Sequence, residues 1–252
     1  MSEAPRDPMR AAQANMRPAA IRRFYKTVDV RDAASGEHAL MLDGRGARTP
    51  GRNLLAAKSR ALMLEVAAEW ERQRDTVEPA DMPLTRLLNS AVDGVSRTMA
   101  ETRAEVLKYA GSDLLCYRAK EPEALAERQA EAFDPVLHWA AERLGARFRL
   151  GAGVTHVEQP PESIEAIRTA IEDFDDPVGL AALSVLTTLS GSALLALAIA
   201  RGRLSPEEGW RAAHVDEDFQ AERWGADGEA RARREARWRE FEAAALAASA
   251  SG

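Results

Sequence analysis

The sequence predicts an α+β protein in which a small N-terminal antiparallel β domain is followed by a C-terminal α-helical bundle. Residues 23–30 are rich in aromatic and β-branched side chains, which favours a strand. The Asp-Gly pair at residues 43–44 is typical of a hairpin turn. From residue 122 onwards the pattern of apolar residues is helical. We therefore expect a disordered arm over residues 1–20, a β-rich domain with helices over 21–120 and a helical domain over 121–252.

The remaining β structure is expected close to the first strand. Residues 38–42 form the next strand, and residues 47–49 return after the turn and end at Pro50-Gly51. Residues 113–118 can add one more strand, just before the domain boundary expected at 118–124.

Helices are predicted from apolar stripes and from residues that begin and end helices. The stripe at residues 62–70 and the stronger one at 84–95 follow helical spacing. Thr98 and Glu101 match a capping box that opens a helix ending near Gly111. Further helices are expected to start at Asp134-Pro135 and to end at Gly145, to cover residues 164–174, to start at Ser205, and to cover 229–248.

Residues 178–200 contain no charged side chain over 23 residues, a length that could span a bilayer. The centre of this segment is polar, however, because residues 187–192 include threonine, serine and glycine. A helix that is apolar on all sides also suits the centre of a globular protein. We expect a buried helix, or two helices broken near Gly191, and no membrane insertion.

Composition and motifs argue against several functional classes. The net charge of −6 is unlike that of a basic nucleic-acid-binding domain, so we expect no nucleic-acid partner. Cys116 is the single cysteine and is expected to be a buried thiol. The four histidines share no metal-ligand spacing, and the glycine-rich residues 44–51 lack the Gly-Lys-Ser/Thr ending of a phosphate loop. We therefore expect no metal, no cofactor and no enzymatic activity.

The most distinctive segment is the acidic and aromatic stretch from His214 to Gly225. On one continuous helix, Trp210, His214 and either Glu217 or Asp218 would share a face. The three acids at 216–218 cannot all point to one side, because neighbouring helical residues lie about 100° apart. The stretch is either an ordinary amphipathic helix or a recognition surface for a basic or hydrophobic partner segment.

This segment resembles the signature of the ATP synthase assembly chaperones that bind the alpha subunit of the soluble catalytic sector. The family pattern is an acidic triplet, an aromatic residue, glutamine, three variable residues and Trp-Gly, which here are Asp216-Glu217-Asp218-Phe219-Gln220 and Trp224-Gly225. The resemblance extends over about residues 20–226. Other similar pieces occur in the same order, at residues 22–26, 48–51, 82–85, 113–118, 128–129 with 134–135, and 186–200.

The resemblance implies an ATP-independent chaperone that binds the free alpha subunit transiently and prevents its aggregation before assembly with beta. The partner-binding residues that it implies are Glu217, then Asp218, together with Asp216, Phe219, Gln220 and Trp224. We expect a monomer located in the bacterial cytoplasm, or in the mitochondrial matrix if the source is eukaryotic. The alternatives are a small hydrolase or transferase with a site outside known motifs, and a membrane-associated adaptor that uses residues 178–200.

Overall fold

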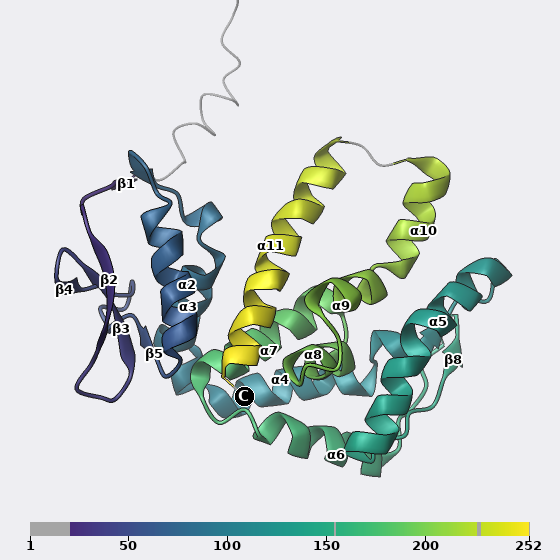
Figure 1. Ribbon diagram of the computed structural model, residues 1–252. Helices are drawn as coiled ribbons and strands as arrows, with labels where there is room; N and C mark the ends of the chain where they lie inside the picture. The colour runs from purple at the N-terminus through teal and green to yellow at the C-terminus, as the bar shows by residue number, and fades with distance from the viewer. Residues whose placement is uncertain (1–20, 154, 226–227, 252) are drawn as a thin grey trace, which may run out of the picture.

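The computed structural model describes residues 21–153, 155–225 and 228–251. The arm expected at residues 1–20 lies outside them. Figure 1 shows β1 to β5 gathered at one end of the molecule, helices over most of the rest, and β8 beside α5 at the other end, which confirms the predicted fold class. The strands that the structure describes are short: β1 Ile21–Arg22, β2 Val28–Asp32, β3 His38–Leu42, β4 Arg45–Gly46, β5 Ala56–Ala57, β6 Thr76–Val77, β7 Tyr117–Arg118 and β8 Gly151–Ala152.

The main sheet is built on β3, which pairs antiparallel with β2, β4 and β5. Asp43 and Gly44 turn the chain between β3 and β4 with positive φ angles of 49° and 76°, as a tight hairpin turn requires. Leu40 and Leu42 of β3 are buried. The sheet packs against α2 (Arg60–Glu71), the helix predicted from the stripe at residues 62–70.

Two β predictions need correction. The strand expected at residues 23–30 begins only at Val28, because the Lys26 and Thr27 amides donate to the Asp43 carboxylate and not to a neighbouring strand. The return strand expected at 47–49 lies at residues 45–46, and Arg48 forms only an isolated bridge with Leu54.

Helices make up most of the described chain. After α2 they are α3 Pro83–Asp93, α4 Met99–Gly111, α5 Glu123–Trp139, α6 Pro161–Glu172, α7 Pro177–Ser190, α8 Ala193–Ala200, α9 Pro206–Ala213, α10 Val215–Trp224 and α11 Gly228–Ala250. Short 3-10 turns lie at Pro79–Asp81, Val95–Arg97 and Leu114–Cys116, and a π-helical turn lies at Ala140–Leu144.

Three predictions of local structure at helices are wrong. The Thr98 hydroxyl donates to the Gly94 carbonyl, so the expected capping box does not form, although α4 does follow Thr98. Residues 114–116 form a 3-10 turn before the two-residue strand β7, where we expected one longer strand. The helix expected to start at Asp134-Pro135 starts instead at Glu123 and includes Pro135 in its interior.

The start at residue 134 fails because Asp134 has another partner. Its carboxylate accepts a hydrogen bond from Arg118 Nη2 at 2.6 Å and does not cap a helix. A proline inside a helix removes one backbone hydrogen bond, and here the α5 helix passes into the π-helical turn a few residues later. Gly145 ends this region with a φ of 73°, as predicted.

The uncharged segment forms two buried helices, α7 and α8, which confirms the break expected near Gly191. Gly191 adopts a φ of 70°, and the Ser192 hydroxyl accepts from the Leu195 amide at 3.0 Å to cap α8. In the part of the chain that the structure describes, no helix is both long enough and apolar enough to cross a membrane.

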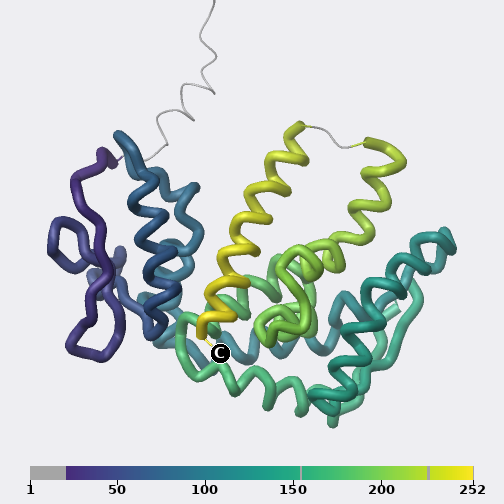
Figure 2. The backbone as a smooth tube through the Cα atoms, in the orientation of Figure 1, coloured from purple at the N-terminus to yellow at the C-terminus, as the bar shows by residue number. Residues whose placement is uncertain are grey.

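Helix α7 lies at the centre of the helical part and packs against α3, α4, α8 and α11. In Figure 2, α11 runs back from the edge of the molecule towards its middle, where the chain ends. One continuous buried cluster extends from Leu40 in the sheet through Leu183 in α7 to Phe241 in α11. The domain boundary near residue 120 stays a prediction.

A buried carboxylate, Asp113, connects the two helix starts next to this break. It accepts hydrogen bonds from the Ser192 hydroxyl at 2.7 Å and from the Leu115 and Leu194 amides, each at 3.1 Å. Burial raises the pKa of Asp113 to about 6, although these hydrogen bonds act in the opposite direction. The carboxylate therefore caps both the 3-10 turn and α8.

This raised pKa predicts a specific dependence of stability on pH. Between its unfolded value of 3.8 and about 6, Asp113 holds its proton in the folded state but not in the unfolded chain. Its contribution to stability therefore falls as the pH rises through this window, by up to about 3 kcal/mol, and is constant above it. Asp113→Asn removes the titration. Urea unfolding of both proteins at about pH 4.5 and pH 7 measures the effect, and wild type should lose stability relative to the variant as the pH rises. A stability difference that does not depend on pH would contradict a raised pKa for Asp113.

Candidate functional site

Helix α10 carries all six residues predicted to contact a partner. It is separate from α9, whereas one continuous helix from Trp210 onwards would have placed Trp210 and the acids on a shared face. The chain breaks between α9 and α10 at His214, which has φ −119° and ψ 22°, so Trp210 and the acids do not share one continuous helical face. Trp210 and His214 nevertheless stay in contact. His214 Nδ1 donates to the Trp210 carbonyl at 2.8 Å, and the two ring centroids are 3.8 Å apart. Burial lowers the pKa of His214, which favours the neutral ring.

The three consecutive acids point in different directions, as helical spacing predicts. Asp216 accepts a hydrogen bond from the Gln129 side chain of α5 at 2.7 Å. Asp218 forms an ion pair with Arg234 of α11. Glu217 is exposed, and no described residue forms a hydrogen bond or ion pair with its carboxylate. Two of the acids therefore hold α10 in place, and Glu217 is available to a partner.

Phe219 also serves the fold more than the surface. Its ring is 6% exposed and lies under two guanidinium groups, those of Arg223 at 4.1 Å and Arg128 at 5.2 Å. Arg128 in turn pairs with Glu222 at 2.7 Å. These contacts fasten α10 to α5, because Arg128 belongs to α5 and the other residues belong to α10.

We expect Asp216→Ala to lower the free energy of unfolding by about 1–2 kcal/mol. The substitution leaves the amide of Gln129, which is 4% exposed, without its acceptor. The matched control is Glu217→Ala, which removes an exposed carboxylate and should change stability by less than about 0.5 kcal/mol. Urea unfolding of both variants measures the two effects, and equal losses would show that Asp216 does not anchor α10.

Glu217, Gln220 and Trp224 line a groove between α10 and α11. The groove has a volume of about 530 Å³. Figure 1 shows the two helices side by side at the edge of the molecule. Trp224 is 86% exposed, and α10 ends after it at Gly225, as predicted. Tryptophan is enriched at protein interfaces, where one end of the indole is buried and its N–H can find a partner.

The opposite wall of the groove is basic, and the sequence indicated this basic helix face but not its position opposite α10. Arg233 pairs with Glu229 at 2.6 Å within α11, and Arg237 donates to the Leu189 carbonyl at 3.1 Å. Spacing along α11 marks these arginines as a helix face, but only the tertiary structure shows that this face lies opposite α10. The arginines that line the groove are Arg231, Arg233, Arg234 and Arg237.

A catalytic site would need convergent polar groups with shifted pKa values, and the strongest such cluster surrounds Asp113. Asp113, Ser192 and Cys116 are fully buried, and Asp113 is occupied in capping two helices. Burial raises the pKa of Cys116 to about 12, so its thiol stays protonated and is a poor nucleophile. This cluster gives no support to the hydrolase or transferase alternative.

Among the described residues, no three His, Cys, Asp or Glu side chains are placed to hold a metal ion.

Comparisons with known proteins give one consistent family. Residues 22–141 match the family described as ATP12 chaperone protein. "Protein atp12, mitochondrial" of Schizosaccharomyces pombe is 26% identical over 219 residues, which cover 82% of this chain and 74% of the yeast protein. The solved structure of Atp12 from Paracoccus denitrificans is similar with a TM-score of 0.85 and 39% identity, over 92% of this chain and 99% of that one. A protein of Agrobacterium tumefaciens, described as a candidate chaperone, is similar with a TM-score of 0.89 and 45% identity, over 97% of this chain and 91% of that one.

Proposed function

Because the chain belongs to the ATP12 chaperone family, whose members assist assembly of the ATP synthase catalytic sector, we propose that it binds the free alpha subunit of that sector and prevents its aggregation before it meets beta. The structural observation that carries the choice of site is Trp224, which is 86% exposed and lines the same groove as the exposed Glu217. An exposed aromatic with polar neighbours is typical of the residues that dominate protein interfaces. The expected location stays the bacterial cytoplasm, or the mitochondrial matrix if the source is eukaryotic.

The proposed activity needs no nucleotide. A subunit that has not yet assembled exposes a large apolar interface, and such surfaces aggregate. A chaperone that covers this interface by binding alone prevents aggregation. Release then requires only a partner that binds the same surface more tightly, which in this proposal is the beta subunit.

The six predicted contact residues divide into two groups. In this proposal Glu217, Gln220 and Trp224 contact the alpha subunit, because they line the groove. Asp216, Asp218 and Phe219 are positioning residues, whose contacts with Gln129 of α5, Arg234 of α11 and Arg223 hold α10 in place.

The direct test is suppression of aggregation. Purified alpha subunit is diluted from denaturant without ATP, and light scattering is followed with and without an equimolar amount of the chain. We expect strong suppression at this ratio, with an unrelated helical protein of similar size as the control. Unchanged scattering at equimolar ratio would rule out the proposed function.

Glu217→Ala should weaken binding to the alpha subunit by roughly fivefold, because it removes a partner-accessible carboxylate. Glu172→Ala is the matched control, since Glu172 is an exposed glutamate at the end of α6, distant in sequence from α10. Titration of labelled alpha subunit with each variant gives the affinities. Equal affinities for the two variants would remove Glu217 from the contact site.

A further inference from the structure

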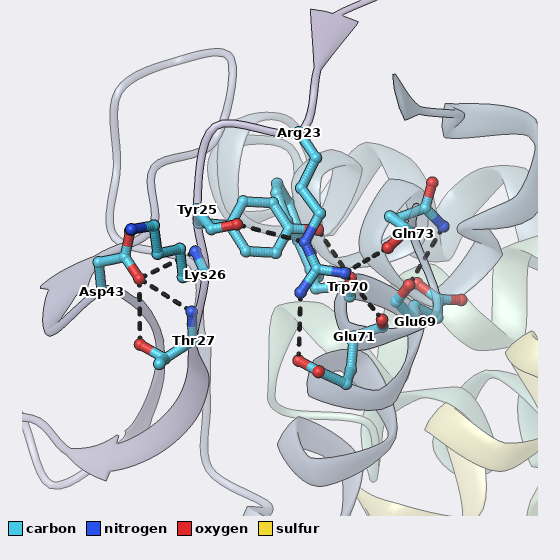
Figure 3. Close-up of polar contacts among 9 residues, drawn as sticks. All are labelled: Arg23, Tyr25, Lys26, Thr27, Asp43, Glu69, Trp70, Glu71 and Gln73. Carbon is cyan, nitrogen blue, oxygen red and sulfur yellow. Dashed lines mark hydrogen bonds and ion pairs between the residues drawn. The ribbon is translucent and has the colours of Figure 1, made fainter. Parts of the chain in front are cut away.

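The segment between β1 and β2 is held in a fixed conformation although it belongs to no strand. Arg23 Nε donates to the Tyr25 carbonyl at 3.3 Å. Arg23 Nη1 donates to the carbonyls of Glu71, at 3.1 Å, and of Gln73. The guanidinium also lies 3.5 Å from the Glu71 carboxylate. Figure 3 shows this side chain reaching from the segment to the end of α2.

Tyr25 continues the connection into the helical part. Its hydroxyl donates to the Trp70 carbonyl at 2.7 Å, and the two rings are 5.4 Å apart. Trp70 Nε1 donates to the Thr85 hydroxyl at 3.1 Å, and that hydroxyl donates to Glu69 at 2.8 Å. Glu69 is 1% exposed and caps α3 by accepting from the Leu84 and Thr85 amides.

The other side of the segment is fixed by Asp43. Its Oδ1 accepts from the Lys26 amide at 3.0 Å, and from the Thr27 amide at 2.8 Å and hydroxyl at 3.1 Å, as Figure 3 shows. Residues on both sides of Phe24 are therefore anchored, to α2 on one side and to the hairpin turn on the other.

Phe24 itself faces outwards. Its side chain is 65% exposed, and its ring meets the Tyr25 ring edge to face, with centroids 5.4 Å apart. It lies at a hollow of about 640 Å³ whose other lining residues include Trp70, Arg45 and Arg48. Both arginines are exposed, and no described residue forms an ion pair with either guanidinium. We call Phe24, Arg45 and Arg48 the Phe24 surface.

We propose that the Phe24 surface is a second contact site for the client, and that it receives an acidic segment carrying an apolar side chain. The apolar side chain would pack on Phe24 while carboxylates pair with Arg45 and Arg48. Because the surrounding hydrogen bonds already fix the segment, little conformational entropy remains to be lost on binding. This inference rests on the proposed function, since it assigns the surface to the same alpha subunit.

Two features support a second site for one client. A stable interface covers about 800 Å² on each partner, more than the few groove residues of α10 can provide. In Figure 1 the sheet and α10 lie at opposite ends of the molecule, so contacts at both would spread over one broad client surface.

The test compares variants of the full chain in binding to purified alpha subunit. Phe24→Ala should weaken binding by about tenfold, and Arg45→Glu with Arg48→Glu by at least as much, with a smaller dependence of affinity on salt. The matched controls are Leu150→Ala and Arg149→Glu. They change an apolar side chain that is 52% exposed and an exposed arginine beside it, and should leave affinity within about twofold of wild type.

The outcomes separate this inference from the proposed function. If Trp224→Ala weakens binding while the Phe24-surface variants bind like wild type, the second site is excluded and the proposed function stands. If wild type does not bind the alpha subunit, both are excluded. Light scattering of the chain alone adds a third outcome: a dimer that Phe24→Ala dissociates would assign the surface to self-association and overturn the proposal.

Discussion

Phe241→Ala is expected to lower the free energy of unfolding by about 3–5 kcal/mol. Phe241 is fully buried, and its ring centroid lies 5.2 Å from that of Trp210 and 6.2 Å from that of Trp238. Alanine would leave a cavity between α11 and α9 and would remove the aromatic contacts that join them. Urea unfolding followed by far-UV circular dichroism measures the loss.

The control for this prediction lies on the same helix. Leu246 is 38% exposed, so Leu246→Ala should cost less than about 1 kcal/mol. The buried cluster indicates that the end of α11 is packed in the core. Equal stability of the two variants would contradict this.

Trp224→Ala should weaken binding to the alpha subunit by about 30-fold, which corresponds to roughly 2 kcal/mol. A buried indole is among the largest single contributions to a protein interface, and Trp224 is 86% exposed in the free chain. The same exposure means that the substitution should leave the unfolding free energy within about 0.5 kcal/mol of wild type. Titration of labelled alpha subunit measures the affinity.

Trp224→Phe tests whether the aromatic surface itself is what matters. It should retain most of the binding, because phenylalanine keeps an aromatic face while losing the indole N–H. If Trp224→Ala binds as tightly as wild type, the groove between α10 and α11 is not the contact site, whatever the aggregation assay shows.

The parts of the fold that the sequence predicted are those set by local signals. The stripes at residues 62–70 and 84–95 became α2 and α3, because helical spacing of apolar residues reports directly on which side of a helix is buried. The break at Gly191 was equally visible, since glycine readily adopts the positive φ that ends a helix.

Two of the wrong predictions share one cause, which is a tertiary partner that competes with a local signal. Asp134 is a good helix-capping residue, but Arg118 takes its carboxylate. The aromatic and β-branched residues 24–27 favour a strand, but the Asp43 carboxylate takes the Lys26 and Thr27 amides. Neither partner could be identified from spacing along the chain.

The candidate site also has one part that the sequence predicted and one part that it did not. Helical geometry alone predicted that Asp216, Glu217 and Asp218 could not act as one patch, and their partners confirm it. The basic wall of the groove could not be predicted, because α11 approaches α10 only through the folding of the whole C-terminal part. The sequence signal, arginines on one face of a charged helix, is the same for a solvated surface.

The burial of side chains in α11 changes along its length. Every residue from 228 to 240 is exposed or half-buried, whereas Phe241, Ala244 and Ala248 are buried in the core. Substitutions at the exposed positions of the first half therefore cost the protein little stability, and those at the buried positions of the second half cost it much. The exposed side chains of the first half can therefore change without loss of the fold, while the buried half stays under strict constraint.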